Sequence, residues 1–181
     1  LSVDLAETER MFAELPPTFV AVSAVSNVTG YILPAEKIFR MAKKYKAFTL
    51  LDGAQAVGLL KLHFAALRAD ALTFAGHKTL YGPFGIAGFY LKNGVDLNIL
   101  LSGGTGSQSE SLEMPRTIPG KLECASKDTV AICGLHAALD ILVEGVGGKR
   151  DNRDRLRVIA VYLPDGPRGL QAVHLRLAHV H

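Results

Sequence analysis

Apolar runs alternate along the chain with segments of helical spacing. The run at 18–23 is rich in β-branched residues and shows no alternation of apolar and polar positions, which is typical of a strand buried on both faces. Further runs at 48–51, 70–74 and 86–91 predict three more strands. Each of the first three runs is followed by polar or glycine-bearing residues, which indicates that the strands end there.

The segments between the strands favour helices. Leu5 to Leu15 predicts a short helix that the following prolines end, and Pro34 suits the first turn of a second helix. A third helical segment is expected around 64–68, and a mostly apolar helix over 127–144. The apolar stripe of the second helix consists of Ile38, Met41, Ala42 and Tyr45. Strands that alternate with helices predict an α/β fold with a mostly parallel sheet.

Composition narrows the class of protein. The 181 residues are 49% hydrophobic and 20% charged, which fits about one soluble globular domain and excludes a disordered chain or a coiled coil. No apolar run reaches the length of a membrane span, and the first residues do not resemble a secretory signal. Cys124 and Cys133 are too few for a disulfide scaffold or a cysteine-only zinc site, so we expect a cytoplasmic protein without a metal. The missing initiator methionine indicates a processed or partial chain.

Positive charge is concentrated at the end of the chain. Residues 149–181 hold seven basic and three acidic groups, and they account for the net charge of +3. The arginines there form no regular face and are not interleaved with aromatic residues. We therefore expect neither a nucleic acid nor a membrane as partner.

Three polar residues follow three predicted strands, namely Asn27, Asp52 and Lys78. Open parallel sheets bind ligands at the carboxyl ends of their strands, so this coincidence indicates a binding site. Taken singly, Asp52, Lys78 and the neighbouring His77 each have a simpler explanation. Asp52 suits a turn or cap, Lys78 a solvated surface, and His77 a polar strand end.

The spacing of these residues resembles a known family. Asp52-Gly53-Ala54-Gln55 is followed 26 residues after Asp52 by Gly76-His77-Lys78. This resembles the class V aminotransferase and cysteine desulfurase family of fold-type I pyridoxal phosphate enzymes. Supporting segments include Ser26-Asn27-Val28-Thr29-Gly30, Tyr81-Gly82-Pro83-Phe84-Gly85-Ile86 and Gly103-Gly104-Thr105-Gly106-Ser107. The resemblance implies that residues 1–148 are part of the large cofactor-binding domain, a three-layer α/β/α structure.

The resemblance also implies roles on the cofactor. Lys78 matches the Schiff-base lysine, which carries a proton at the substrate α-carbon. Asp52 matches the partner of the pyridine nitrogen, and Gln55 the donor to the ring oxygen. His77 matches a residue that helps to hold the phosphate.

Two further positions match family residues with other roles. Asn27 matches a residue that contacts the substrate carboxylate. Thr105 matches one that reaches the phosphate of the neighbouring subunit's cofactor, which implies a homodimer with shared sites. The implied substrate is an amino acid.

Some positions depart from the family pattern. Ala75 stands where a phosphate-binding serine is usual, Ala24 where many members carry histidine, and the segment 122–126 replaces a usual Glu-x-Gly-Thr stretch. Neither cysteine matches the desulfurase nucleophile. We expect Cys133, which lies within an apolar helix, to be part of the protein core, and Cys124 to lie at a loop-to-helix junction.

The resemblance covers less than a whole family member. We expect residues 149–181 to be a non-matching basic tail that is poorly ordered or irregularly packed. The interpretation is a partial cysteine desulfurase or selenocysteine lyase-like enzyme. Two alternatives stay open, a class V aminotransferase and a non-catalytic remnant of the cofactor domain. From this chain alone we expect weak or absent cofactor binding and no sulfide release from cysteine.

Overall fold

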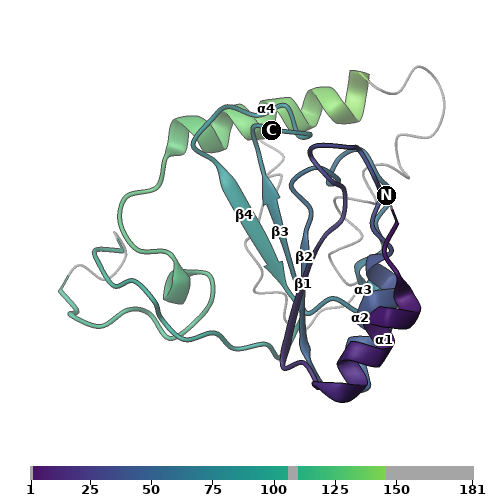
Figure 1. Ribbon diagram of the computed structural model, residues 1–181. Helices are drawn as coiled ribbons and strands as arrows, with labels where there is room; N and C mark the ends of the chain where they lie inside the picture. Colours follow the sequence, from purple (N-terminus) through teal and green to yellow (C-terminus); the bar gives the residue numbers. More distant parts are fainter. Residues whose placement is uncertain (1, 106–109, 146–181) are drawn as a thin grey trace.

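The sheet has four strands, three of them parallel. The computed structural model describes residues 2–105 and 110–145. The sheet order is β1-β2-β3-β4, with β1, β2 and β3 parallel and β4 antiparallel to β3 (Figure 1). The strands are β1 (Phe19–Ser23), β2 (Phe48–Asp52), β3 (Ala71–Ala75) and β4 (Ala87–Leu91). The predicted α/β fold with a mostly parallel sheet is confirmed.

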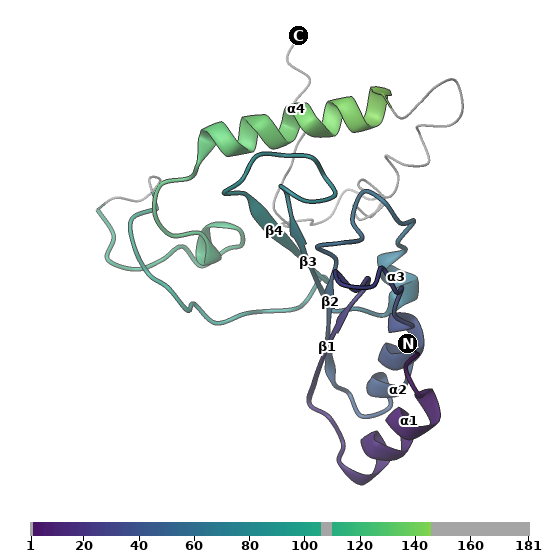
Figure 2. The same cartoon turned by 45° about the horizontal axis from the view of Figure 1, so that its top comes forward.

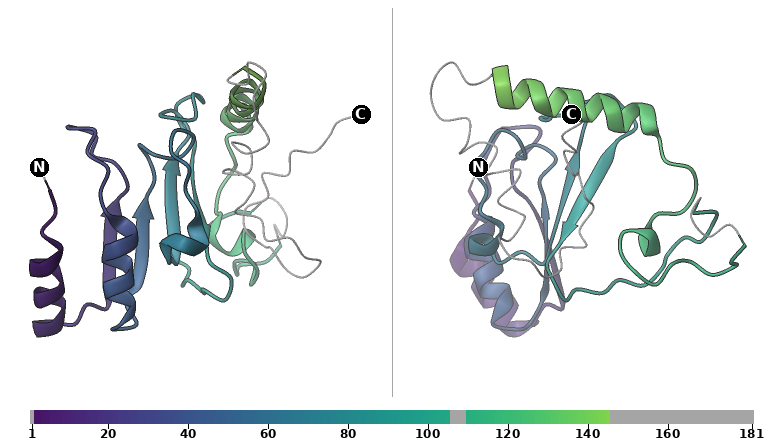
Figure 3. Two further views of the ribbon diagram at one scale, coloured as in Figure 1. Left: turned by 90° about the vertical axis from the view of Figure 1, so that its right-hand side faces the viewer. Right: turned by 180° about the vertical axis from the view of Figure 1, so that it is seen from behind.

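Helices cover one face of the sheet and cross its end. The helices are α1 (Leu5–Glu14), α2 (Ala35–Lys43), α3 (Phe64–Leu67), the 3-10 turn η1 (Gly120–Leu122) and α4 (Thr129–Gly145). Figures 1 and 3 show α1, α2 and α3 on the same side of the sheet. Figure 2 shows α4 lying across the end of the sheet. The side chain of Asp4 caps α1 by accepting from the Glu7 N–H at 2.9 Å, and Tyr45 lies beyond the end of α2.

The core lies between the sheet and the helices. Val22, Leu51 and Leu72 point from neighbouring strands toward this side and are buried. Alternate residues of β1 point to the other face, where Phe19 is 54% exposed. The prediction that 18–23 is buried on both faces is therefore wrong, because the helices of the described residues pack against one face only.

The helix α4 is mostly apolar and is buried along one side. Ala131, Leu135 and Leu139 are buried, and Leu135 packs against the loop after β3. Cys133 is exposed, so the prediction of a core cysteine is wrong. Two residues of helix turn a side chain by about 200°, which places Cys133 away from the contact made by Ala131 and Leu135. Among the described residues, no helix is both long and apolar enough to cross a membrane.

The basic tail predicted at 149–181 lies outside the described residues. Its expected disorder and the domain boundary at 148 stay predictions.

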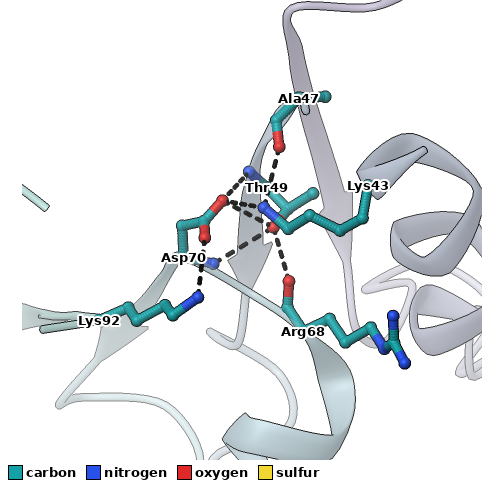
Figure 4. Close-up of polar contacts among 6 residues, drawn as sticks. All are labelled: Lys43, Ala47, Thr49, Arg68, Asp70 and Lys92. Carbon is teal, nitrogen blue, oxygen red and sulfur yellow. Dashed lines mark hydrogen bonds and ion pairs between the residues drawn. The ribbon is translucent and has the colours of Figure 1, made fainter. Parts of the chain in front are cut away.

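A buried carboxylate joins β2 and β3 near the amino ends of both strands. The Oδ2 atom of Asp70 accepts a hydrogen bond from the Thr49 N–H at 2.9 Å and another from the Lys43 ammonium (Figure 4). The Asp70 N–H donates to the Thr49 carbonyl at 2.8 Å. Burial on its own would raise the pKa of Asp70. The hydrogen bonds from Lys43 and Thr49 outweigh this effect, so the pKa of the Asp70 carboxyl is lowered.

We expect Asp70→Asn to lower the free energy of unfolding by about 2–3 kcal/mol at pH 7, because the partly buried Lys43 ammonium loses its anion. The pKa of Asp70 is lower in the folded protein than in the unfolded chain, where it is about 4. The Asp70 carboxylate therefore contributes its full stabilisation above about pH 4, and this contribution is lost as the pH falls through the folded-state pKa. The difference between the two proteins should therefore shrink below about pH 4.

Urea unfolding of both proteins across this pH range measures the effect. Glu36→Gln, which removes an exposed ion pair with Arg40, is the control and should change stability little. A loss of equal size at pH 7 and well below pH 4 would show that the Asp70 charge is not responsible.

Candidate active site

The carboxyl ends of β1, β2 and β3 lie at one edge of the sheet. Ser23 at the end of β1 pairs with Asp52 at the end of β2, and Asp52 pairs with Thr73 of β3. Asn27 follows β1 by a short loop, and Lys78 follows β3 by a short turn. The structure therefore places the three strand-end residues predicted from the sequence at the same edge.

Two hydrogen bonds orient the carboxylate of Asp52. The Ser23 hydroxyl donates to Oδ2 at 3.2 Å, and the Ala54 N–H donates to Oδ1 at 3.0 Å. The residue is exposed, and it makes no ion pair with any residue of 2–105 or 110–145. The result is an oriented, exposed carboxylate that can face a cationic or protonated ligand atom.

Gln55 and Asn27 are brought together by the turn after β2. The side-chain amide of Gln55 donates a hydrogen bond to the side-chain oxygen of Asn27. The turn itself is closed by hydrogen bonds from the N–H groups of Ala56 and Val57 to the Gly53 carbonyl, both at 2.9 Å. The bond between Gln55 and Asn27 joins the loop after β1 to the turn after β2.

Lys78 lies on a turn that is anchored at several points. The Gly82 N–H donates to the Gly76 carbonyl at 2.8 Å, and the Tyr81 N–H donates to the Lys78 carbonyl at 3.1 Å. The Thr79 hydroxyl donates to the Val57 carbonyl at 2.6 Å, which ties this turn to the one that carries Gln55. The Lys78 side chain is exposed and has no ion-pair partner within the described part of the chain.

His77 is exposed and stacks on Phe84. The two ring centroids are 4.9 Å apart and the rings are inclined by 26°. Phe84 itself is 84% exposed, so the pair forms an aromatic surface beside Lys78. The predicted role of His77 toward a phosphate stays a prediction.

Thr105 and the two cysteines lie on other segments of the chain. Thr105 is half-buried in the loop that precedes residues 106–109. Cys124 is half-buried, and both cysteines are free thiols. The predicted reach of Thr105 to a neighbouring subunit stays a prediction.

Sequence reasoning missed two residues of the site, Ser23 and Thr79. Ser23 supplies a hydrogen bond to Asp52, and Thr79 joins the two turns. The signal for Ser23 was present, because it ends β1 as Asp52 ends β2, and strand ends in parallel register are neighbours. No sequence pattern indicated Thr79, since its partner is a backbone carbonyl in a different turn.

Glycines allow the close packing at this edge. A Cβ atom on Gly53 would lie 2.7 Å from Cγ2 of Val57 and 2.9 Å from the Thr73 carbonyl oxygen. A Cβ atom on Gly76 would lie 2.7 Å from Cγ2 of Ile86. Gly53 follows Asp52 and Gly76 precedes His77. The close packing of the backbone at these two glycines therefore helps to position both candidate groups.

The arrangement offers a fixed carboxylate, a free amine, two amides and an imidazole on neighbouring loops. Such groups can bind and protonate a polar organic ligand. Among the described residues, no group of three or more His, Cys, Asp or Glu side chains could hold a metal ion.

Comparison with known proteins gives a consistent result. The family described as Aminotransferase class-V matches residues 2–162 of the chain. A cysteine desulfurase of Yersinia pestis is 38% identical over 130 residues, which cover 69% of this chain and 32% of the relative. The chain therefore spans about a third of the length of the curated relatives that it matches.

Solved structures show the same likeness. An apo structure of a cysteine desulfurase from Thermococcus onnurineus superposes with a TM-score of 0.63 at 27% identity, covering 84% of this chain and 38% of that one. A cysteine desulfurase from Escherichia coli gives a TM-score of 0.61 at 25% identity, covering 81% and 37%.

We expect Gly53→Ala to lower the free energy of unfolding by about 1–3 kcal/mol, because its methyl group would overlap a backbone oxygen that cannot withdraw without separating β2 from β3. Gly104→Ala is the control, since its Cβ would meet no atom within 4 Å. Thermal unfolding of both variants compares them. Equal stability of the two variants would contradict the close approach at Gly53.

Proposed function

Because the chain belongs to the class V aminotransferase family, we propose that it is the cofactor-binding part of a cysteine desulfurase-like enzyme that uses pyridoxal phosphate. One observation carries the proposal. An oriented carboxylate at Asp52 and an exposed lysine at Lys78 follow neighbouring parallel strands, and neither has an ion-pair partner among the described residues. Relatives that bear the name cysteine desulfurase support the choice within the family.

The residues present fit the pyridine ring and the aldehyde of this cofactor. A carboxylate held by two donors suits a protonated ring nitrogen, and an amine without a counter-ion suits a carbonyl carbon. The phosphate end is less well provided, because Ala75 offers no hydroxyl next to His77. When bound, pyridoxal phosphate supplies an electron sink for the bonds at the substrate α-carbon.

Each residue contributes a separate task. Lys78 would hold the cofactor through its amine and move a proton at the substrate α-carbon. Asp52 would keep the proton on the ring nitrogen, and Ser23 would hold Asp52 in that orientation. Gln55 would donate to the ring oxygen while Asn27 binds the substrate carboxylate, and their mutual hydrogen bond keeps the two amides adjacent.

The substrate that we propose for the whole enzyme is cysteine or its selenium analogue. Loss of sulfur or selenium to an acceptor leaves alanine. The shared site implied by Thr105 makes a homodimer the proposed assembly, with His77 and Thr105 serving phosphates of the two subunits. Free thiols at Cys124 and Cys133 suit a reducing cytoplasm. Aminotransfer is the alternative reaction, and a non-catalytic remnant of the cofactor domain is the alternative to an enzyme.

We expect borohydride reduction of the chain in excess pyridoxal phosphate to fix the cofactor on Lys78. Reduction is irreversible, so it accumulates product even when reversible binding is weak. Peptide mapping by mass spectrometry reads the position. Lys78→Ala should remove the label from the peptide, and Lys61→Ala, which changes an exposed lysine elsewhere, should leave it in place.

Two outcomes of this labelling would reject the assignment. The first is a label that survives Lys78→Ala at the same yield. The second is a preferred label on Lys43 or Lys92, which lie near the amino ends of the strands.

We expect Ser23→Ala to weaken cofactor binding about 3- to 10-fold, because Asp52 loses one of the two donors that orient it. Ser23→Thr keeps a hydroxyl and should restore most of the affinity. Asp52→Asn should weaken binding further and alter the pH dependence of the absorbance of the bound cofactor. Fluorescence titration and absorbance spectra measure both effects. If Asp52→Asn changes neither the affinity nor the absorbance of the cofactor, the proposed function fails. If Asp52→Asn weakens binding and Ser23→Ala does not, only the role of Ser23 is rejected.

A further inference from the structure

A hollow lies at the opposite end of the strands from the candidate active site. Its volume is about 580 Å³, and its lining comes from α2, the α3 region and the end of β4 with the residues that follow. It adjoins Asp70 and Thr49, which lie near the amino ends of β3 and β2. The candidate active site occupies the carboxyl ends of the same strands, so a ligand in this hollow would leave that site open.

The inner wall of the hollow is apolar and aromatic. Phe64 and Ala69 are buried, and Tyr90 meets Phe64 edge to face, with ring centroids 4.3 Å apart and an angle of 78° between the rings. Burial raises the pKa of Tyr90, in keeping with a poorly hydrated wall. This wall can receive an apolar side chain.

The rim of the hollow is cationic. Lys43, Arg68 and Lys92 line it, and none of the lining residues is acidic. Asp70 neutralises Lys43 through a direct hydrogen bond, while the Lys92 ammonium lies 4.0 Å from Asp70 and is 62% exposed. Arg68 is exposed and has no ion-pair partner in the described residues, and Figure 4 shows its guanidinium turned away from Asp70. Two positive charges therefore remain for a ligand.

The backbone conformation at position 68 gives no reason for an arginine there. Its φ of 58° and ψ of 28° are left-handed, a conformation that favours glycine or asparagine. The contact that this conformation supplies is made by the carbonyl, which accepts from the Thr49 hydroxyl at 2.9 Å. That contact uses the backbone and needs no particular side chain. The Arg68 guanidinium, which has no ion-pair partner among the described residues, is therefore available to an external partner.

We propose that this hollow docks an acidic segment of a partner protein, with an apolar side chain against Phe64 and Tyr90 and carboxylates at Arg68 and Lys92. Charge complementarity selects an acidic partner. Ala65, Arg68, Lys92 and Asn93 are exposed, so a small molecule here would keep much of its surface in water, whereas a polypeptide also contacts the rim. The inference does not depend on the cofactor or on the reaction.

The test uses the full 181-residue chain and a fluorescein-labelled peptide of about eight residues that alternates glutamate with phenylalanine. Fluorescence anisotropy at about 50 mM salt should give saturable binding that weakens at about 500 mM salt. A matched peptide with glutamine in place of glutamate should bind about 10-fold more weakly or not at all.

Variants locate the site. Arg68→Asn removes the guanidinium and suits the left-handed backbone, so it should weaken peptide binding about 3- to 10-fold without lowering the unfolding temperature. Lys92→Gln should act similarly, and Lys61→Gln, outside the hollow, should leave binding unchanged within about 2-fold. Equal binding of the two peptides, equal effects of Lys61→Gln and Arg68→Asn, or no binding would overturn the proposal. Tighter binding of a single-stranded oligonucleotide that Arg68→Asn abolishes would do the same, because it would make nucleic acid the occupant.

Discussion

The register between β2 and β3 is the constraint on which the rest of the structure depends. Side chains alternate between the faces of a strand, so a slip by one residue would move every side chain of β2 to the opposite face. The hydrogen bonds between Asp70 and Thr49 hold this register near the amino ends of the strands. The same register sets Asp52 opposite Thr73 at the carboxyl ends and leaves its carboxylate exposed. Hydrogen bonds between Asp70 and Thr49 at one end of the sheet thus help to position a candidate catalytic group at the other.

The sequence was informative where a residue's neighbours are local or follow from strand pairing. The four strands and the helices α1, α2 and α4 were predictable because the period of apolar residues reports them directly. The edge that gathers Asn27, Asp52 and Lys78 was also predictable, since parallel strands bring their carboxyl ends together.

Burial was less predictable, because it depends on which elements pack outside a strand or helix. Phe19 and Cys133 have apolar neighbours in sequence but face away from the elements that cover the core. The hydrogen bond of Thr79 to the Val57 carbonyl joins two turns whose distance no pattern reports. Arg68 illustrates the same limit. Its left-handed backbone could not be predicted, because it places the carbonyl beside the hydroxyl of Thr49, a residue of β2.

The two ends of the parallel strands have different chemical character. The carboxyl end presents an anion, an amine and amides on short turns, which suits a polar ligand with a carbonyl group. The amino end presents an apolar wall beneath cations, which suits an acidic polypeptide. Because the two sites lie at opposite ends of one sheet, a partner in the hollow would leave the carboxyl-end site open.

The central claim is that the loops after β1, β2 and β3 form one cofactor-binding edge. Hydrogen–deuterium exchange of the chain before and after borohydride fixes pyridoxal phosphate on it tests this claim most directly, because fixation overcomes the weak binding expected from this chain. We predict slower exchange on cofactor addition in the segments 24–31, 53–59 and 76–82, with little change in 64–70 at the amino ends of the strands. Unchanged exchange in those three segments, or protection confined to 64–70, would contradict the account.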